Sequence, residues 1–261
     1  MTQPILKMQN VSKVFGGVKA LNDVSVDVFP GDVLGIIGPN GSGKTTIVNN
    51  ITWFIKPTSG KIFFKDKDIT AMPPHKIADM GVTRTFQVMR PYYSLPAYMN
   101  LVIPLFSPRA KRTGGWRGGG RLRDRATVAV DILEEIGFER DCNIPFKPTS
   151  SLPTGYLKRL ELARCLSLKP EIIICDEVFS GLSMSEIASM VPLIERLRDE
   201  GITIVMIEHR LRELFQLANR VMVMNFGEKL IEGTSDEVMA DAKVKEAYFG
   251  SEKIEEVMTY A

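Results

Sequence analysis

The alternation of apolar and polar residues predicts strands and turns in the first third of the chain. Residues 5–15 and 21–29 alternate like half-buried strands, and residues 33–38 (VLGIIG) form the short apolar run of a buried strand. A glycine-rich stretch and a helix-compatible segment follow this run directly. Residues 61–69 then predict a hairpin strand with Gly60 in its turn.

The last third alternates between strand-like and helix-like patterns. These segments lie at 171–177, 184–201, 202–209, 210–219 and 220–233. Strands that alternate with helices predict a parallel sheet covered by helices on both faces. Residues between about 71 and 165 contain helices, prolines and a loose loop instead, which indicates an insertion between two halves of one α/β core.

Composition favours an ordinary globular protein. The 261 residues are 44% apolar and 25% charged, and 33 basic against 31 acidic residues predict no polyanionic partner. Cys142, Cys165 and Cys175 have no short paired spacing, so we expect neither a disulfide framework nor a zinc site, and a reducing cytoplasm is the default. Residues 1–10 lack a signal-peptide core, and no apolar run approaches about 18 residues, so any membrane role is expected to be peripheral.

Residues 108–125 are unusually basic. The segment has a single acid, Asp124, together with five glycines and Trp116. Its basic residues are Arg109, Lys111, Arg112, Arg117, Arg121, Arg123 and Arg125. We interpret it as a flexible, solvated surface loop, with contact to anionic lipid headgroups or to an acidic loop of a membrane partner as the alternative. Nucleic acid comes third, because one basic loop without a basic domain is a weak footprint.

The strongest chemical signal is GPNGSGKT at residues 38–45, which fits G-x-x-x-x-G-K-[ST] in full. An apolar strand precedes it and a helical segment follows it, which is the context that the motif requires. The glycines let successive N–H groups point at phosphate oxygens, aided by the positive end of the helix. Lys44 can reach the outer phosphates, and the Thr45 hydroxyl can ligate Mg²⁺.

A second half-site is predicted by IIICDE at residues 172–177. The apolar run predicts a buried strand with Asp176 and Glu177 at its carboxyl end, where open α/β sheets bind ligands. Asp176 is expected to hold the Mg²⁺ shell, and Glu177 is expected to orient or deprotonate the attacking water.

Over nearly its whole length the chain resembles the ATP-binding subunits of ABC transporters, with the motifs in that family's order. The resemblance implies a P-loop NTPase core of ABC type, with a mixed sheet flanked by helices, an N-terminal antiparallel β subdomain and an inserted α-helical subdomain. The expected boundaries are 4–250 for the domain, 4–87 and 166–250 for its core, and 88–165 for the helical subdomain. Residues 226–261 predict a closing hairpin and helix, with a tail of unassigned role at 251–261.

The resemblance also implies residue roles. Phe15 matches the aromatic on which adenine stacks, Val18 lies where the ribose is touched, and Gln87 matches a glutamine that senses Mg²⁺. His209 matches the γ-phosphate switch, whereas His75 is expected only to start a helix. The implied nucleotide-binding residues are Phe15, Val18, Gly38, Pro39, Asn40, Gly41, Ser42, Gly43, Lys44, Thr45, Thr46 and Gln87. The implied catalytic residues are Glu177, His209 and Lys44, and the implied metal ligands are Thr45, Gln87 and Asp176.

The signature motif and the D-loop depart from the family's pattern. Pro153 stands where the family nearly always has serine, and it removes a hydroxyl and a backbone N–H donor. Thr154 brings a hydroxyl back one residue later, and Tyr156 replaces the usual glutamine. Ser183 replaces the usual D-loop aspartate, and Val178 replaces a frequent proline. The signature comprises Leu152, Pro153, Thr154, Gly155 and Tyr156, and the D-loop comprises Ser180, Gly181, Leu182 and Ser183.

In this family a signature acts on the nucleotide bound by the partner subunit. The resemblance therefore implies a competent site at this chain's own phosphate loop and a weakened site facing its altered signature. Loss of one or two donors to a γ-phosphate would cost about 2–4 kcal/mol, or about 30- to 1,000-fold in rate. We therefore expect an asymmetric heterodimer.

Within the family, GPNGSGKTT, GVTRTFQ, MIEH and EAYFGS are most similar to importers of branched-chain and other hydrophobic amino acids. The resemblance implies ATP and Mg²⁺ as cofactors and a peripheral location on the cytoplasmic face of the inner (plasma) membrane. It implies as partners two membrane-spanning permease subunits, a second, different ABC ATPase subunit and a periplasmic or extracellular solute-binding protein. No nucleic acid is expected.

Two functions stay open at this point. One is an ATPase subunit that drives solute import, favoured by Glu177 and His209. The other is a nucleotide-gated regulatory half of a heterodimer, with slow or no hydrolysis at the site facing its altered signature. An ABC protein of DNA repair or translation is disfavoured, because it would need a long coiled coil or two such domains.

Overall fold

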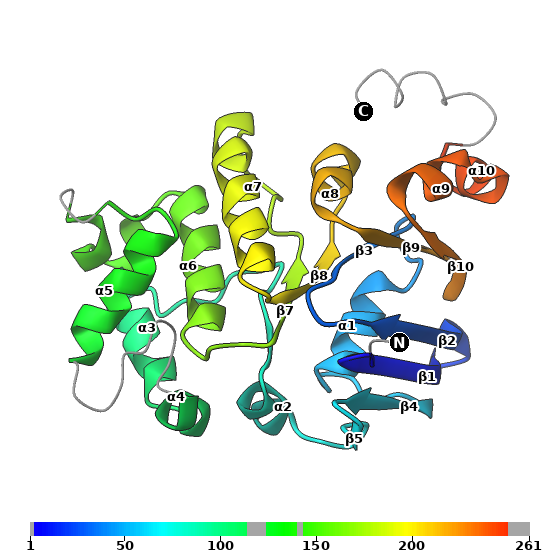
Figure 1. Cartoon of the computed structure of the whole chain (residues 1–261), viewed down its shortest axis with the longest axis horizontal. Helices are drawn as coiled ribbons and strands as arrows, with labels where there is room; N and C mark the ends of the chain where they lie inside the picture. Colours follow the sequence, from blue (N-terminus) through cyan, green and yellow to red (C-terminus); the bar gives the residue numbers. More distant parts are fainter. Residues whose placement is uncertain (1–2, 114–123, 140–142, 250–261) are drawn as a thin grey trace. The chain divides into compact units, whose positions relative to one another are not determined.

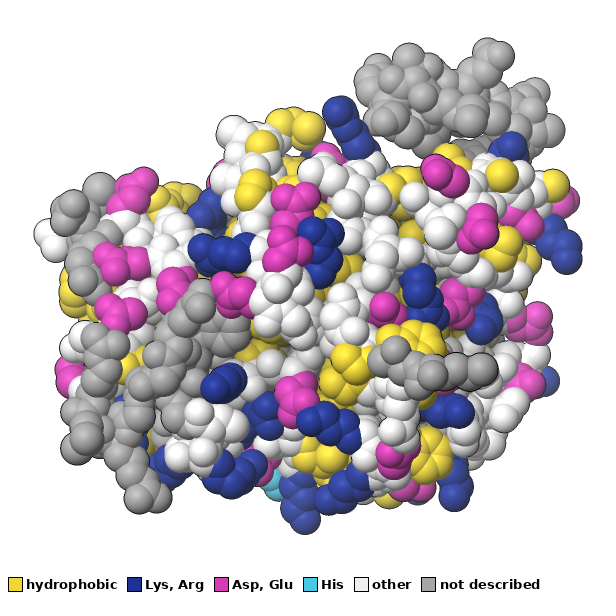
Figure 2. Space-filling view, viewed as in Figure 1, with side chains coloured by type: hydrophobic (Ala, Val, Ile, Leu, Met, Phe, Trp, Pro, Cys, Tyr) yellow, Lys and Arg dark blue, Asp and Glu magenta, His cyan; other side chains and the backbone are white. Residues whose placement is uncertain are grey.

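The computed structural model of the protein describes residues 3–113, 124–139 and 143–249 (Figure 1). The chain forms two compact units. Unit 1 comprises residues 1–74 and 194–261, and unit 2 comprises residues 75–193. Side chains of both signs are scattered over the face seen in Figure 2, so the described surface there carries no broad field of one sign.

The first sheet of unit 1 is antiparallel and has the strand order β2-β1-β4-β5. Its strands are β1 (Leu6–Phe15), β2 (Val18–Val28), β4 (Ser59–Phe64) and β5 (Lys67–Asp68). The expected N-terminal β subdomain is therefore confirmed. The expected place of Gly60 in the hairpin turn is wrong: Gly60 lies inside β4, with a φ of +87°, where a side chain would collide with the carbonyl oxygen of Asn10. Lys65 and Asp66 make the turn instead, both with positive φ.

Four further strands of unit 1 carry the phosphate-loop motif and its neighbours. They are β3 (Val33–Ile37), β8 (Thr203–Ile207), β9 (Arg220–Asn225) and β10 (Glu228–Gly233). β3 pairs in parallel with both β8 and β9, and β10 closes the edge antiparallel to β9. Every residue of β3 and β8 is buried, which explains their uninterrupted apolar sequences.

Helices follow these strands in unit 1. They are α1 (Lys44–Ile51), α8 (Leu211–Leu217), α9 (Ser235–Ala240) and α10 (Ala242–Phe249). Thr234 and Glu237 form a capping box that starts α9 directly after β10. The predicted closing hairpin followed by helix is thus confirmed as far as residue 249.

Unit 2 combines a pair of parallel strands with helices. The strands are β6 (Val82–Arg84) and β7 (Ile172–Asp176). The helices are α2 (Pro74–Met80), α3 (Ala97–Leu105), α4 (Pro108–Thr113), α5 (Arg125–Glu135) and α6 (Thr154–Leu166). α3 contacts both α5 and α6, and α7 (Met184–Asp199) leads from unit 2 back into unit 1.

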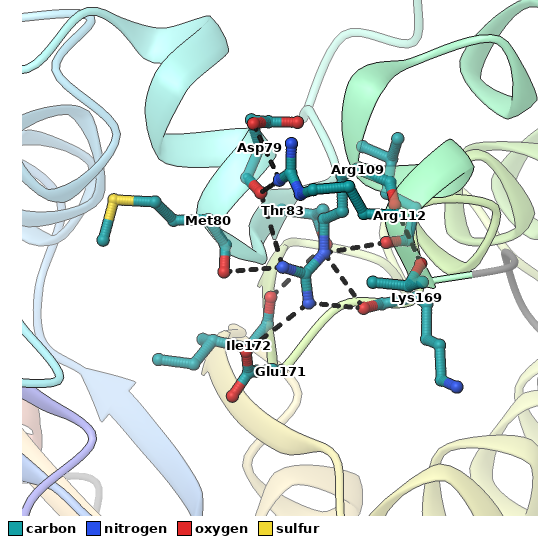
Figure 3. A network of polar contacts seen from close by, with 10 residues as sticks. Asp79, Met80, Thr83, Arg109, Arg112, Lys169, Glu171 and Ile172 are labelled. Atoms are coloured by element: carbon teal, nitrogen blue, oxygen red, sulfur yellow. Dashed lines mark hydrogen bonds and ion pairs between the residues drawn. The ribbon is translucent and has the colours of Figure 1, made fainter.

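Arg109 contradicts the expectation of a solvated loop at the start of segment 108–125. It lies in α4 and is 7% exposed. Its guanidinium donates to the carbonyl oxygens of Met80 at 2.7 Å and Lys169 at 2.7 Å, as Figure 3 shows. Carbonyl oxygens of the last residue of α2 and of the segment that follows α6 thus hold the buried guanidinium. Trp116, Arg117, Arg121 and Arg123 lie outside the described residues.

In the described part of the chain, no helix combines the length and the apolar character needed to cross a bilayer.

Candidate nucleotide site

The phosphate loop connects β3 to α1 in unit 1. Gly38, Gly41 and Gly43 have positive φ, and a side chain at Gly43 would bring its Cβ within 2.6 Å of the carbonyl oxygen of Ala20. The loop thus needs glycine both for its curvature and for its close approach to β2. Among the described residues, no side chain caps the N-terminus of α1 and no acid lies in its first turn. The N–H groups there suit a phosphate.

Lys44 folds back onto its own loop. Its Nζ donates to the carbonyl oxygens of Gly38 at 2.6 Å and of Pro39 at 3.0 Å, and the residue is 6% exposed. A buried ammonium group requires partners of this kind. Within the described chain, the buried Ser42 hydroxyl has no hydrogen-bond partner, so the same loop also holds an unsatisfied polar atom.

The hairpin between β1 and β2 exposes the two residues expected at the base and ribose. Phe15 is 44% exposed and Val18 is 70% exposed, and they form a cross-strand pair. The Lys13 ammonium lies 4.8 Å from the centroid of the Phe15 ring. An accessible ring of this kind can stack on a flat base.

His209, the expected switch, belongs to the same unit. It is exposed and lies two residues beyond the end of β8.

The expected acids belong to unit 2. Asp176 is the last residue of β7, is 1% exposed, and accepts from the Arg84 guanidinium at 2.6 Å through its Oδ2. Its backbone N–H donates to the Thr85 hydroxyl at 3.1 Å. Its Oδ1 is buried and has no hydrogen-bond partner among the described residues. A hard divalent cation would satisfy this oxygen, so the residue fits a role as a Mg²⁺ ligand.

Glu177 and Gln87 are brought together in unit 2. Gln87 Nε2 donates to Glu177 Oε2 at 2.8 Å, and Lys158 Nζ donates to the carbonyl oxygen of Glu177 at 2.8 Å. Lys158 and Arg84, which hold the two acids, are not among the residues expected from the sequence. Their sequence positions lie 19 and 92 residues away from the acids, and no local motif signals these contacts.

The altered signature starts α6. Pro153 is the N-cap residue and supplies no side-chain hydrogen bond, Thr154 is the exposed first residue, and Gly155 is buried. The Tyr156 ring packs edge-on against Phe138, with centroids 5.0 Å apart. The aromatic side chain that replaces the usual glutamine therefore packs against an aromatic ring.

Comparison with known proteins accounts for the order of these motifs. The family profile described as "ABC transporter" matches residues 21–180. The high-affinity branched-chain amino acid transport ATP-binding protein LivG of Escherichia coli (strain K12) is 36% identical over 259 residues, covering 96% of this chain and 99% of that protein. The corresponding protein BraF of Pseudomonas aeruginosa is 34% identical over 258 residues, covering 96% of this chain and 99% of its own length.

A solved structure gives the same answer for the fold. The crystal structure of the ADP conformation of MJ1267, an ATP-binding cassette of an ABC transporter, has a TM-score of 0.81 at 33% identity, covering 96% of this chain and 100% of that one. The chain belongs to the ABC transporter family. It is an ATP-binding cassette and an ATPase, and these comparisons give no support to a purely regulatory subunit.

The segment expected to be the D-loop of this ABC ATPase ends in a helix cap. Ser183 precedes α7, and its hydroxyl accepts from the Glu186 N–H at 3.3 Å while Glu186 Oε2 accepts from the Ser183 N–H at 2.8 Å. This is a capping box, and S-x-x-E at 183–186 could have revealed it from the sequence. Hydrogen bonds from the Ser183 N–H, from its hydroxyl and from the Gly155 amide lower the pKa of Glu186.

Proposed function

We propose that this cassette powers the import of branched-chain or other hydrophobic amino acids. The observation that carries the proposal is the match, over almost the full length of both chains, to LivG and BraF, whose names give branched-chain amino acid transport. The two hypotheses of the sequence analysis thus reduce to the importer ATPase. We also propose the domain boundaries expected from the sequence, with the helical subdomain at residues 88–165.

In the proposed reaction, Lys44, which donates to the carbonyl oxygens of Gly38 and Pro39, directs an N–H donor to the outer phosphates of ATP. Glu177 orients or deprotonates the attacking water. Gln87, which is hydrogen-bonded to Glu177, would contact the metal. His209 is the proposed γ-phosphate contact, and Phe15 and Val18 receive the base and ribose.

Mg²⁺ is the proposed metal, and its proposed ligands are Thr45, Gln87 and Asp176. When bound, it would neutralise charge on the phosphates. The described residues contain no group of three or more His, Cys, Asp or Glu that could hold a metal ion. Mg²⁺ commonly takes only one or two carboxylates and shares its shell with phosphates and water, and Asp176 is the single carboxylate proposed here.

The proposed assembly places the cassette on the cytoplasmic face of the inner membrane. Its proposed partners are two permease subunits, a second, different ABC ATPase and a solute-binding protein. Pro153 supports the heterodimer, because a homodimer would place an altered signature at both sites.

A reconstituted transporter tests the function. The chain would be purified with the permeases, ATPase and binding protein encoded by neighbouring genes and placed in proteoliposomes. The proteoliposomes would be assayed for ATP turnover and for uptake of leucine, isoleucine, valine and phenylalanine. Uptake of one or more of these amino acids is expected. Glu177→Gln is expected to lower turnover at the site it serves by about 100-fold or more while nucleotide still binds. Glu200→Gln is the matched control, because it makes the same change at an exposed glutamate. It should leave ATP turnover and nucleotide binding unchanged.

Two outcomes would contradict different parts of the proposal. Turnover that responds to another solute class, and to none of the four amino acids, would refute the substrate while leaving the ATPase intact. Full turnover in Glu177→Gln, measured with a partner whose own glutamate is also changed, would refute the role of Glu177.

A further inference from the structure

Gly38, the first residue of the phosphate loop, is held on both sides. Its N–H donates to the phenolic oxygen of Tyr248, and its carbonyl oxygen accepts from Lys44 Nζ at 2.6 Å. Gly38 is buried, so its N–H needs a partner. Gly38 is therefore hydrogen-bonded to both Lys44 and Tyr248.

Tyr248 reaches the loop from α10, near the end of the described chain. Val244, which is 1% exposed, anchors this helix, and α10 contacts α9 and β10. Burial raises the pKa of the Tyr248 phenol to about 12, although the hydrogen bond from Gly38 acts in the opposite direction. The phenol therefore stays neutral at physiological pH.

A cavity of about 810 Å³ lies beside this contact in unit 1. The loop residues 39–42 line it together with Lys243, Glu246 and Ala247 of α10 and with Phe226, which is 87% exposed. Because open space separates much of α10 from the loop, the Tyr248 hydroxyl is well placed to transmit a shift of the helix to Gly38.

We propose that Tyr248 is a positioning residue for the phosphate loop, through which α10 sets the affinity of the cassette for nucleotide. This role lies beyond the proposed function, in which α10 takes no part. When ATP binds, Lys44 must direct at least one of its three N–H donors to phosphate while the loop keeps its curvature. The Tyr248 hydrogen bond keeps Gly38 in place as Lys44 turns, so less of the binding energy is used to order the loop.

Tyr248→Phe removes the hydroxyl and keeps the ring. In the full-length chain we expect the Kd for a fluorescent ADP analogue, with and without Mg²⁺, to rise about fivefold or more. In the assembled transporter, KM for ATP should rise while kcat at saturating ATP stays within about twofold. Tyr93→Phe is the matched control, because it removes an exposed hydroxyl that donates to the carbonyl oxygen of Met89. Its Kd should not change.

Reciprocity supplies a second readout that does not depend on activity. If α10 affects nucleotide affinity, ADP must affect α10, so ADP should slow hydrogen exchange in residues 242–249 of the wild type and do so less in Tyr248→Phe. Tyr248→Leu, which also loses the ring, separates packing from hydrogen bonding. An unchanged or lower Kd in a stably folded Tyr248→Phe would overturn the proposal, as would identical exchange of α10 with and without ADP.

Discussion

Arg84 and Asp176 form a buried ion pair between two neighbouring parallel strands. Their charged groups are 2.6 Å apart, and the side chains are 6% and 2% exposed. Arg84 ends β6, three residues before Gln87, and Asp176 ends β7. The arginine therefore neutralises one oxygen of the acid, while the other oxygen has no hydrogen-bond partner in the described chain.

Arg84→Met should destabilise the cassette strongly, because it leaves the buried Asp176 carboxylate without its counter-charge. We expect the free energy of unfolding to fall by about 3–5 kcal/mol in urea titrations monitored by circular dichroism. Lys61→Met is the control: it removes an exposed pair to Asp68 at 3.9 Å, and should cost less than about 1 kcal/mol. An equal loss of unfolding free energy in the two variants would mean that the buried Arg84–Asp176 pair stabilises the fold no more than an exposed pair does.

Pro153→Ser should restore hydrolysis at the site that faces this chain's signature. The measurement uses an assembled heterodimer in which Glu177→Gln silences the site on this chain's own phosphate loop. Against that background, we expect Pro153→Ser to raise the remaining turnover by about 30-fold or more, since it returns a hydroxyl and an N–H donor. Pro148→Ser, outside the signature, is the matched control. No increase would show that Thr154 already supplies the missing donor.

Arg109 should prove more important for stability than its basic neighbours. Arg109→Met removes hydrogen bonds to the carbonyl oxygens of Met80, Leu168 and Lys169, and should lower the free energy of unfolding by about 2–4 kcal/mol. Arg109→Lys should recover less than half of this, because an ammonium cannot match the planar fork. Arg112→Met, at 56% side-chain exposure, should cost under about 1 kcal/mol in the same urea titration.

The capping box of α7 should make stability depend on pH in the acid range. Ser183→Ala should cost about 1 kcal/mol at neutral pH, because the helix loses its side-chain cap. The pKa of Glu186 lies below its usual 4.5, so its contribution is present above that value and is lost as pH falls through the lowered pKa. Glu186→Gln should therefore lose less stability than the wild type between neutral pH and pH ~3. Parallel urea titrations at several pH values would measure this, and identical slopes would contradict it.

The phosphate loop could be predicted from sequence because its requirements are local: glycine where φ is positive, an apolar strand before it and a helix after it. The long-range contacts that hold the acids and the phosphate loop could not be predicted. Arg84 and Asp176 lie 92 positions apart, and Gly38 and Tyr248 lie 210 apart, so only the folded chain pairs them.

The burial of Arg109 could not be predicted, for a different physical reason. Its basic, glycine-rich surroundings are typical of a solvated loop, and most of its hydrogen-bond partners are backbone carbonyl oxygens, which no residue type in the sequence signals. The role of Ser183 is predictable from the sequence: besides replacing the family's usual aspartate, it begins S-x-x-E, a helix-start signal that the structure bears out.

Glu177 lies in the left-handed region, with a φ of +53°, where a residue other than glycine is disfavoured by about 1–2 kcal/mol. Lys158 and Gln87 hold it there. Glu177→Gly should relieve this strain, but the greater chain entropy of glycine and the lost hydrogen bond to Gln87 offset the gain, so the free energy of unfolding should stay within about 1 kcal/mol of the wild type in a urea melt. Because Glu177 is the proposed catalytic residue, hydrolysis should be lost in the same variant. Backbone geometry at position 177 favours glycine while the proposed chemistry requires a carboxylate, so the chain carries local strain at the residue to which catalysis is assigned.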